Sequence, residues 1–354
     1  MSEEDEEEDG SNGTPTPSVS STSTSELVPP PEGQSSTAPE LSPIFKVAPA
    51  PYAGGFGLYA TRPIRRGTPI FLERPALLQP PSTRSNSTIM AALARCTRDE
   101  QRHYFALANS FKHPRPGFPA LLPAQGIFET NFLPCPRPRR RTASNKGEER
   151  DEELDGIFLQ ASRFNHSCRP NVAFAWDPHA GRATFRALRD VSAGEEMCIN
   201  YAGVDVLGTL AERRSIALED FGFRCACEVC ALEGEAAVES DRRRAGIRRL
   251  FEDVAECGKE PTLGLRKIKI ALRMLKEEHL VHYEASFCFD AFQFCVSVSD
   301  FANAKAWVRK AWEASCNTSG PDSPAARTFK TYWLNPRSHQ LVGTLPRMKL
   351  SGPD

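Results

Sequence analysis

Two stretches of the chain decide its fold: Phe164-Asn165-His166-Ser167-Cys168-Arg169-Pro170-Asn171 and Cys225-Ala226-Cys227-Glu228-Val229-Cys230. The second stretch places three thiols close together, directly after Phe221-Gly222-Phe223-Arg224. A structural zinc site takes four nitrogen or sulfur ligands in a tetrahedron, so these thiols need a fourth ligand from another part of the fold. Cys168 and His166 are the candidates. The pattern therefore predicts a zinc site that joins the two stretches, because a cluster of free thiols without a use would be an oxidation liability.

Length and composition describe a globular protein with a real core. The 354 residues are enough for one large or two ordinary domains, and 40 % of them are hydrophobic. The net charge of -1 argues against a nucleic-acid binder that works through bulk positive charge. The chain holds no apolar run of about 18 residues or more, so we expect no membrane span.

The N-terminus and the cysteines bear on the cellular compartment. The sequence opens with Met1-Ser2-Glu3-Glu4-Asp5 and lacks the basic and apolar regions of a signal peptide. We therefore expect a protein of the nucleus or cytoplasm that is not secreted. There the 11 cysteines should be reduced, and the tight cluster indicates a metal rather than disulfides. Cys288 and Cys295 lie in an apolar segment and should be small core residues.

Short strands and turns dominate the first half of the chain. Residues 1–41 are acidic and then rich in Ser, Thr and Pro, so they should be disordered. Residues 44–74 predict β-structure with a hairpin turn at Gly67, and a similar hairpin is expected at Gly194. Residues 88–111 predict a helix, with Thr97 and Glu100 as a capping box. The charged, Pro-rich span 134–153 should be a flexible surface insertion.

The period of the apolar residues changes to that of helices after the cysteine cluster. Leu265, Ile268, Leu272 and Leu275 repeat at helical spacing, and Asp300 is a plausible N-cap for the next such run. Residues 240–335 therefore predict an α-helical domain. Antiparallel pairs of the tetratricopeptide kind are one arrangement for it, although no strict repeat is visible.

Three sets of residues could carry chemistry. Asn165 and His166 suit directional hydrogen bonds to an adenosine, and no well-placed nucleophile and acid complete a catalytic triad with the histidine. Gly55-Phe56-Gly57 would let the backbone approach a cofactor closely, or would form a bulge in a hairpin. Tyr201 ends an apolar strand, where a core tyrosine and a catalytic one look alike.

Taken in order, these motifs resemble a SET domain of the branch that includes the SET-MYND proteins and their fungal relatives. The resemblance implies an α+β fold over residues 42–232: a β-rich SET domain with a post-SET zinc site, interrupted by a helical and flexible insertion at about 79–155. An α-helical C-terminal domain would follow. Relatives with a MYND finger carry it between the SET halves, and this chain has only Cys96 and Cys135 there, so that finger cannot form.

The resemblance also implies a role for each candidate residue. Tyr201 would be catalytic, Phe221 would line the substrate channel, and the zinc would be held by Cys168, Cys225, Cys227 and Cys230. S-adenosylmethionine would be bound by Gly55, Phe56, Gly57, Asn131, Ser162, Asn165, His166 and Phe223. Phe221 departs from the tyrosine that the family often has at this position.

The predicted function is therefore an S-adenosylmethionine-dependent protein-lysine N-methyltransferase acting on a histone or non-histone protein. The alternative is a zinc-stabilised SET pseudoenzyme that serves as an interaction scaffold through its helical domain. A zinc-dependent nucleic-acid module is disfavoured, because no basic face accompanies the cysteines. We expect a monomer whose partner is a lysine-containing protein substrate, with no membrane and no direct nucleic-acid binding.

Overall fold

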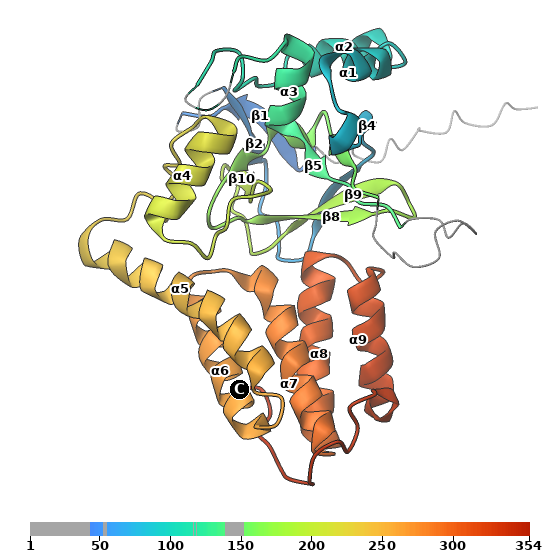
Figure 1. The fold of residues 1–354 in the computed structure, drawn as a ribbon, viewed down its shortest axis with the longest axis vertical. Coiled ribbons are helices and arrows are strands. Elements are labelled where there is room, and N and C mark those ends of the chain that lie inside the picture. Colours follow the sequence, from blue (N-terminus) through green and yellow to red (C-terminus); the bar gives the residue numbers. More distant parts are fainter. Residues whose placement is uncertain (1–42, 52–54, 116, 118, 139–151) are drawn as a thin grey trace, which may run out of the picture. The chain divides into compact units, whose positions relative to one another are not determined.

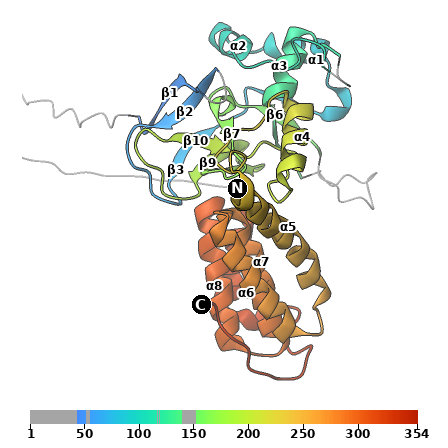
Figure 2. The same cartoon turned by 90° about the vertical axis from the view of Figure 1, so that its left-hand side faces the viewer.

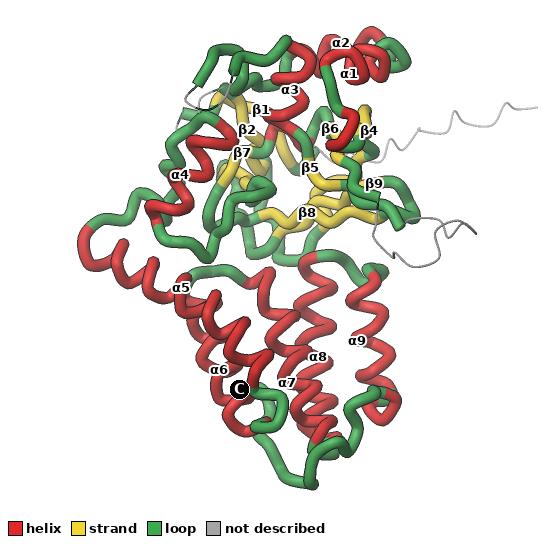
Figure 3. Tube along the Cα trace, viewed as in Figure 1, coloured by secondary structure: helices red, strands yellow, loops and turns green. Residues whose placement is uncertain are grey.

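The computed structural model describes residues 43–51, 55–115, 117, 119–138 and 152–354. The predicted disordered tail 1–41 and most of the predicted flexible insertion lie outside the described residues. Among those described, strands with short helices between them extend to Ile199 and helices make up the rest, so the mixed α+β class is confirmed (Figures 1 and 3). No helix in these ranges combines the length and apolarity that crossing a bilayer requires.

Three small sheets form the β-rich part. The first has the order β1-β2-β10-β7, the second β3-β9-β8 and the third β4-β6-β5. Their bounds are β1 Phe45–Pro49, β2 Phe56–Ala60, β3 Pro69–Glu73, β4 Leu77–Gln79, β5 Leu133–Pro134, β6 Asp155–Ile157, β7 Asn165–His166, β8 Val172–Asp177, β9 Arg182–Ala187 and β10 Glu196–Ile199.

The pairing of β10 places the site. β10 runs antiparallel to β2 and parallel to β7, with Cys198 opposite Asn165 and Ile199 opposite His166. Residues that are distant in the sequence thus become neighbours at the point where β10 ends and the chain continues to Tyr201.

Both hairpins predicted from the glycine turns are wrong. Gly67 and Gly194 do adopt a positive φ of 81°. However, β2 and β3 on either side of Gly67 belong to different sheets, as do β9 and β10 around Gly194. Each turn moves the chain from one sheet to another, because long-range strand pairing overrides the local turn signal.

Short helices replace the single helix predicted over residues 88–111. α1 (Asn86–Leu93) and α2 (Arg98–Phe105) are separate, and α3 (Pro123–Asn131) follows them. The Thr97 capping box is confirmed: its hydroxyl accepts the N–H of Glu100, whose carboxylate accepts the N–H of Thr97. Because this box starts a new helix, it also separates α2 from α1.

The last third of the chain is helical, as predicted. α4 (Leu210–Phe221) precedes the cysteines, and α5 (Gly234–Glu256), α6 (Pro261–Glu277), α7 (Glu284–Ser297), α8 (Phe301–Thr318) and α9 (Pro324–Leu334) follow them. From α5 to α9 each helix packs against the next, and α8 also contacts β8 and β9 (Figures 1 and 2). Asp300 caps α8 as expected, and Cys288 and Cys295 are fully buried.

Candidate active site

The segment between β6 and β7 is held rigidly from both sides. The backbone N–H groups of Gln160 and Ala161 donate to the Glu73 carboxylate at 2.8 and 2.9 Å. Phe164 is 1 % exposed and its ring packs against those of Phe71 and Phe185, at centroid distances of 5.7 and 5.3 Å. These contacts fix the Phe164 carbonyl, which faces Tyr201.

Tyr201 is tied to this segment through two hydrogen bonds. Its hydroxyl donates to the Phe164 carbonyl oxygen at 2.9 Å, and its backbone N–H donates to His166 Nδ1 at 3.1 Å. Burial raises the pKa of the Tyr201 phenol well above its usual value, so the group is neutral at physiological pH. The hydroxyl hydrogen is engaged, and the lone pairs of its oxygen are left for another donor.

His166 is a buried, neutral ring. Burial lowers its pKa to about 4, and because Nδ1 accepts the Tyr201 N–H, the ring proton of the neutral form lies on Nε2. That nitrogen is 3.3 Å from Cys168 Sγ. His166 therefore connects the tyrosine to the cysteine cluster.

Asn165 is oriented by acceptors on two strands. Its side-chain nitrogen donates to Glu196 Oε1 at 2.6 Å and to the Phe56 carbonyl at 3.3 Å. Gly57 makes room for this pair, because a Cβ there would lie 2.9 Å from Asn165 Nδ2 and would collide with the Glu196 carboxylate. Since both contacts use the amide nitrogen, the amide oxygen is turned away from them.

The end of α4 adds two aromatic rings. Phe221 is the last residue of the helix, and Gly222 caps it with a φ of 73°, a left-handed conformation that glycine adopts without strain. The turn brings Phe223 back towards the tyrosine. The Tyr201 ring lies 5.1 Å from that of Phe221 and 6.1 Å from that of Phe223, and His166 is 5.9 Å from Phe223.

A cavity of about 980 Å³ opens over these residues. A narrow second cavity of about 20 Å³ shares five lining residues with it, namely Thr130, Asn131, Ser162, Tyr201 and Phe221. Among the residues predicted for cofactor and substrate, those that line the large cavity are Gly55, Phe56, Asn131, Ser162, Asn165, His166, Tyr201, Phe221 and Phe223.

Two predicted residues relate to this cavity differently from expectation. Gly57 does not line it and acts from behind, by admitting the Asn165–Glu196 pair. The side-chain nitrogen of Asn131 donates to the carbonyls of Ala108 and Ile127, at 2.8 and 2.7 Å. In contrast, the buried Ser162 hydroxyl has no partner among the described residues, which fits a polar ligand in the cavity.

The four predicted cysteines come together. The sulfur atoms of Cys168, Cys225, Cys227 and Cys230 all lie within 4.8 Å of one another, and Cys168 Sγ is 3.9 Å from Cys225 Sγ and 3.6 Å from Cys230 Sγ. His166 is not among the residues whose ligand atoms meet there, although its Nε2 lies beside Cys168 Sγ. A four-sulfur cluster of this size has the donor set of a closed structural zinc site.

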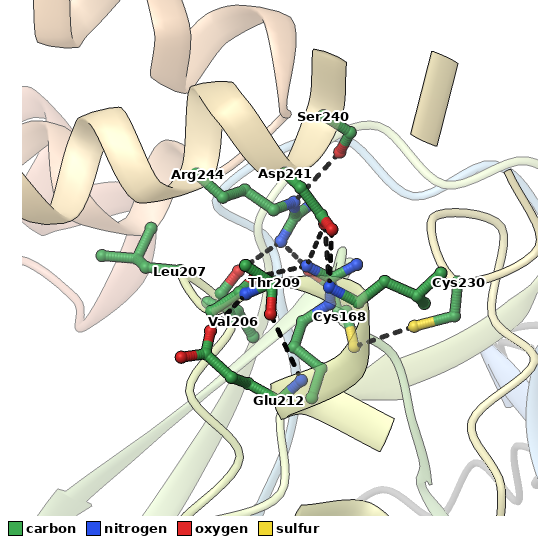
Figure 4. A network of polar contacts seen from close by, with 12 residues as sticks. Cys168, Val206, Leu207, Thr209, Glu212, Cys230, Ser240, Asp241 and Arg244 are labelled. Carbon is green, nitrogen blue, oxygen red and sulfur yellow. Dashed lines mark hydrogen bonds and ion pairs between the residues drawn. The ribbon is translucent and has the colours of Figure 1, made fainter. Parts of the chain in front are cut away.

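Two buried arginines lie close to the cluster, and Figure 4 shows one of them, Arg244, together with Cys168 and Cys230. Arg244 of α5 is fully buried and its Nη1 donates to the carbonyls of Cys168, at 3.1 Å, and Val206. Arg213 of α4 is 1 % exposed and interacts electrostatically with Cys168 and Cys230. Arg213 Nε and Arg244 Nη2 have no partner within the described ranges. Arg213 also pairs with Asp241 and Arg244 with Glu278, so the two cations would offset only part of the negative charge of four thiolates. The four sulfur donors themselves fit zinc.

The Asp241 carboxylate, also on α5, supports α4. It accepts the backbone N–H of Leu210 with both oxygens, each at 2.9 Å, and pairs with Arg213 (Figure 4). A carboxylate at this helix end is stabilising, because the free N–H groups there carry a partial positive charge. The residues of α5 were not predicted to contribute to the site, since nothing in their local sequence indicates it.

Comparison with known proteins settles the family. A family model described as "SET domain" matches residues 55–202. "Histone-lysine N-methyltransferase set5" of Schizosaccharomyces pombe is 34 % identical over 316 residues, which cover 88 % of this chain and 90 % of that protein. The chain belongs to the SET-domain lysine methyltransferases. The resemblance predicted from the sequence motifs is thereby confirmed.

Other similar proteins match shorter parts of this SET-domain chain. "Histone-lysine N-methyltransferase SMYD3" of Homo sapiens is 36 % identical over 83 residues, 23 % of this chain and 18 % of that protein. A crystal structure described as the SET domain of LSMT bound to lysine and AdoHcy aligns over 83 % of this chain and 88 % of that one. With a TM-score of 0.32 and 15 % identity, that likeness is too low to transfer any property.

Proposed function

We propose that this SET-domain protein is an active protein-lysine N-methyltransferase that uses S-adenosylmethionine. The observation that carries the proposal is the position of Tyr201, whose side chain lines both the large cavity and the narrow one. A methyl donor in the large cavity and a lysine side chain in the narrow one would meet at this residue. Family membership supports the same reaction, and the cofactor would supply the methyl group.

The chain's own groups would orient the lysine. Its amine must be neutral to act as a nucleophile, and a neutral Tyr201 phenol does not favour the ammonium form as a phenolate would. The phenol oxygen can accept a hydrogen bond from an N–H of the amine while its own O–H keeps donating to the Phe164 carbonyl. This holds the nitrogen lone pair in one direction, which is the positioning that lowers the barrier to transfer.

We further propose that zinc binds the four-cysteine cluster and holds the segment after α4 over the cavity. Cys225 and Cys227 line the cavity beside Phe223, so a metal on their sulfurs would fix its wall. The metal would thus be structural, since four protein sulfurs leave no open position for a substrate.

The substrate class and the compartment follow from the same relationship. The relative from S. pombe is named as a histone-lysine methyltransferase. We propose a histone or another lysine-containing protein as substrate, with the enzyme in the nucleus or cytoplasm and acting as a monomer.

The test is methyl transfer from labelled S-adenosylmethionine to recombinant histones and to a proteome extract. Tyr201→Phe should reduce transfer by about 10- to 1000-fold, because only the hydroxyl is lost. Tyr104→Phe is the matched control: its hydroxyl also donates to a backbone carbonyl, that of Ala124 at 2.7 Å, but it does not line the cavity. Cofactor binding without any transfer, in wild type and variants alike, would instead support the scaffold alternative.

A further inference from the structure

Four arginines line the large cavity, and they differ in what they contact. Arg189 pairs with Glu195 at 2.6 Å, and Arg169 pairs with Glu228 at 3.7 Å. The side chains of the other two, Arg163 and Arg224, form no hydrogen bond or ion pair with any described residue. Arg224 is exposed, whereas Arg163 is half-buried.

A half-buried guanidinium without a partner is costly. It loses part of its hydration and gains no compensating contact from the protein, and this burial is the cause that lowers the pKa of Arg163. Arg224 meets no such cost, because water can solvate it. Of the two, Arg163 is therefore the one whose environment calls for an anionic ligand.

The backbone around Arg163 places it beside the reaction centre. Ser162, the residue before it, lines both cavities. Phe164, the residue after it, provides the carbonyl that holds the Tyr201 hydroxyl. The 3₁₀ helix that contains Arg163 is itself fixed by Glu73. An anion bound by Arg163 would therefore lie in the large cavity, which Ser162 and Tyr201 also line.

We propose that Arg163 binds the α-carboxylate of the methionine part of S-adenosylmethionine, an inference that rests on the proposed function. In this cofactor only a few bonds separate the carboxylate from the sulfur that carries the methyl group. A sulfur held near Tyr201 thus brings the carboxylate within reach of the neighbouring guanidinium, whose planar donor fork matches a carboxylate. The contact would fix the methionine end of the cofactor in the cavity that Asn165 and His166 also line.

The test compares two ligands that differ in this end. S-adenosylhomocysteine keeps the α-amino acid, and 5′-methylthioadenosine lacks it. Their dissociation constants are measured by titration calorimetry for wild type, Arg163→Gln and Arg224→Gln. We expect Arg163→Gln to weaken the binding of S-adenosylhomocysteine by about 10- to 100-fold, the range for a charged hydrogen-bonded contact. The dissociation constant of methylthioadenosine should change by less than about twofold.

The control and the remaining outcomes decide the inference. Arg224→Gln should leave both ligands unchanged, and Arg163→Lys should restore part of the lost affinity because it returns the charge without the fork. Equal weakening of both ligands by Arg163→Gln, or a selective loss in Arg224→Gln instead, would overturn the assignment of Arg163. A wild type that binds neither ligand would overturn the proposed function, and the assignment with it.

Discussion

Glu278, at the C-terminal end of α6, offers the sharpest test of how the helical part supports the four-cysteine cluster. Its carboxylate accepts Arg244 Nε at 2.9 Å, Arg243 Nε at 2.7 Å and the Ser240 hydroxyl at 2.9 Å. The Glu278 and Arg244 side chains are both 0 % exposed. Glu278→Gln preserves the volume of the side chain but removes its charge and one of its two acceptor atoms.

The expected cost follows from the burial of the pair. The charge of Arg244 would remain inside without its counterion, and breaking a buried pair from one side costs about 3–5 kcal/mol. The value for an exposed pair is about 0.3–0.5 kcal/mol. Arg309 and Glu313 form such a pair on α8, at 2.8 Å and with 60 % and 48 % of their side chains exposed. Glu313→Gln is therefore the matched control.

Two assays read the effect. Urea unfolding, with zinc present throughout, gives the change in free energy of unfolding from the midpoint and slope. Transfer of zinc to a chelator should also be faster in Glu278→Gln, because Arg244 holds the Cys168 carbonyl. A loss below about 1 kcal/mol, with zinc retained as in wild type, would refute the reasoning that this ion pair secures the cluster.

Four further predictions concern single positions. Metal analysis should find one zinc per chain in the wild type, and Cys227→Ser should remove most of it. Gly57→Ala should weaken S-adenosylmethionine binding in calorimetry by about tenfold or more, since its Cβ displaces Asn165. Burial raises the pKa of Asp290 to about 6, so its contribution to stability is complete below about pH 4 and falls as the pH rises through 6. Asp290→Asn should therefore stabilise the protein at pH 8, by about 1–3 kcal/mol in urea unfolding, and not at pH 4. Phe221→Tyr should shift the products towards fewer methyl groups in mass spectrometry, whereas the wild type should at least dimethylate.

The motifs predicted the site because each carries its chemistry in a few adjacent residues. The spacing of Cys225, Cys227 and Cys230 predicted a group of metal ligands, and their sulfur atoms do meet that of Cys168. Gly222 ends α4 in a left-handed turn directly before Phe223. The strand before Tyr201 was likewise visible, although it ends at Ile199. These features depend on residues that are adjacent in the chain, so their local geometry can be predicted from the sequence.

Features that depend on long-range pairing could not be predicted. The turn at Gly67 was predicted as a hairpin because the preference of glycine for a positive φ is visible in the local sequence. Which sheet each flanking strand joins depends on distant residues, and the local sequence does not show it. Glu196 holds the Asn165 amide only because β10 lies between β2 and β7. From the sequence, Arg163 is an ordinary polar residue; only the structure places it at the cavity without a partner among the described residues.

The contacts of α5 change how the helical part should be regarded. Asp241 holds the N-terminus of α4, whose other end carries Phe221 into the cavity, and Arg244 holds the carbonyl of Cys168. α5 thus contacts both the start of α4 and the backbone of Cys168. This helix lies outside residues 55–202, which the SET family model matches. A buried arginine bound to carbonyls and a carboxylate is rigid, because any displacement leaves a charge without partners. The helix that follows the cysteines is therefore part of what shapes the site, and not only a surface for other proteins.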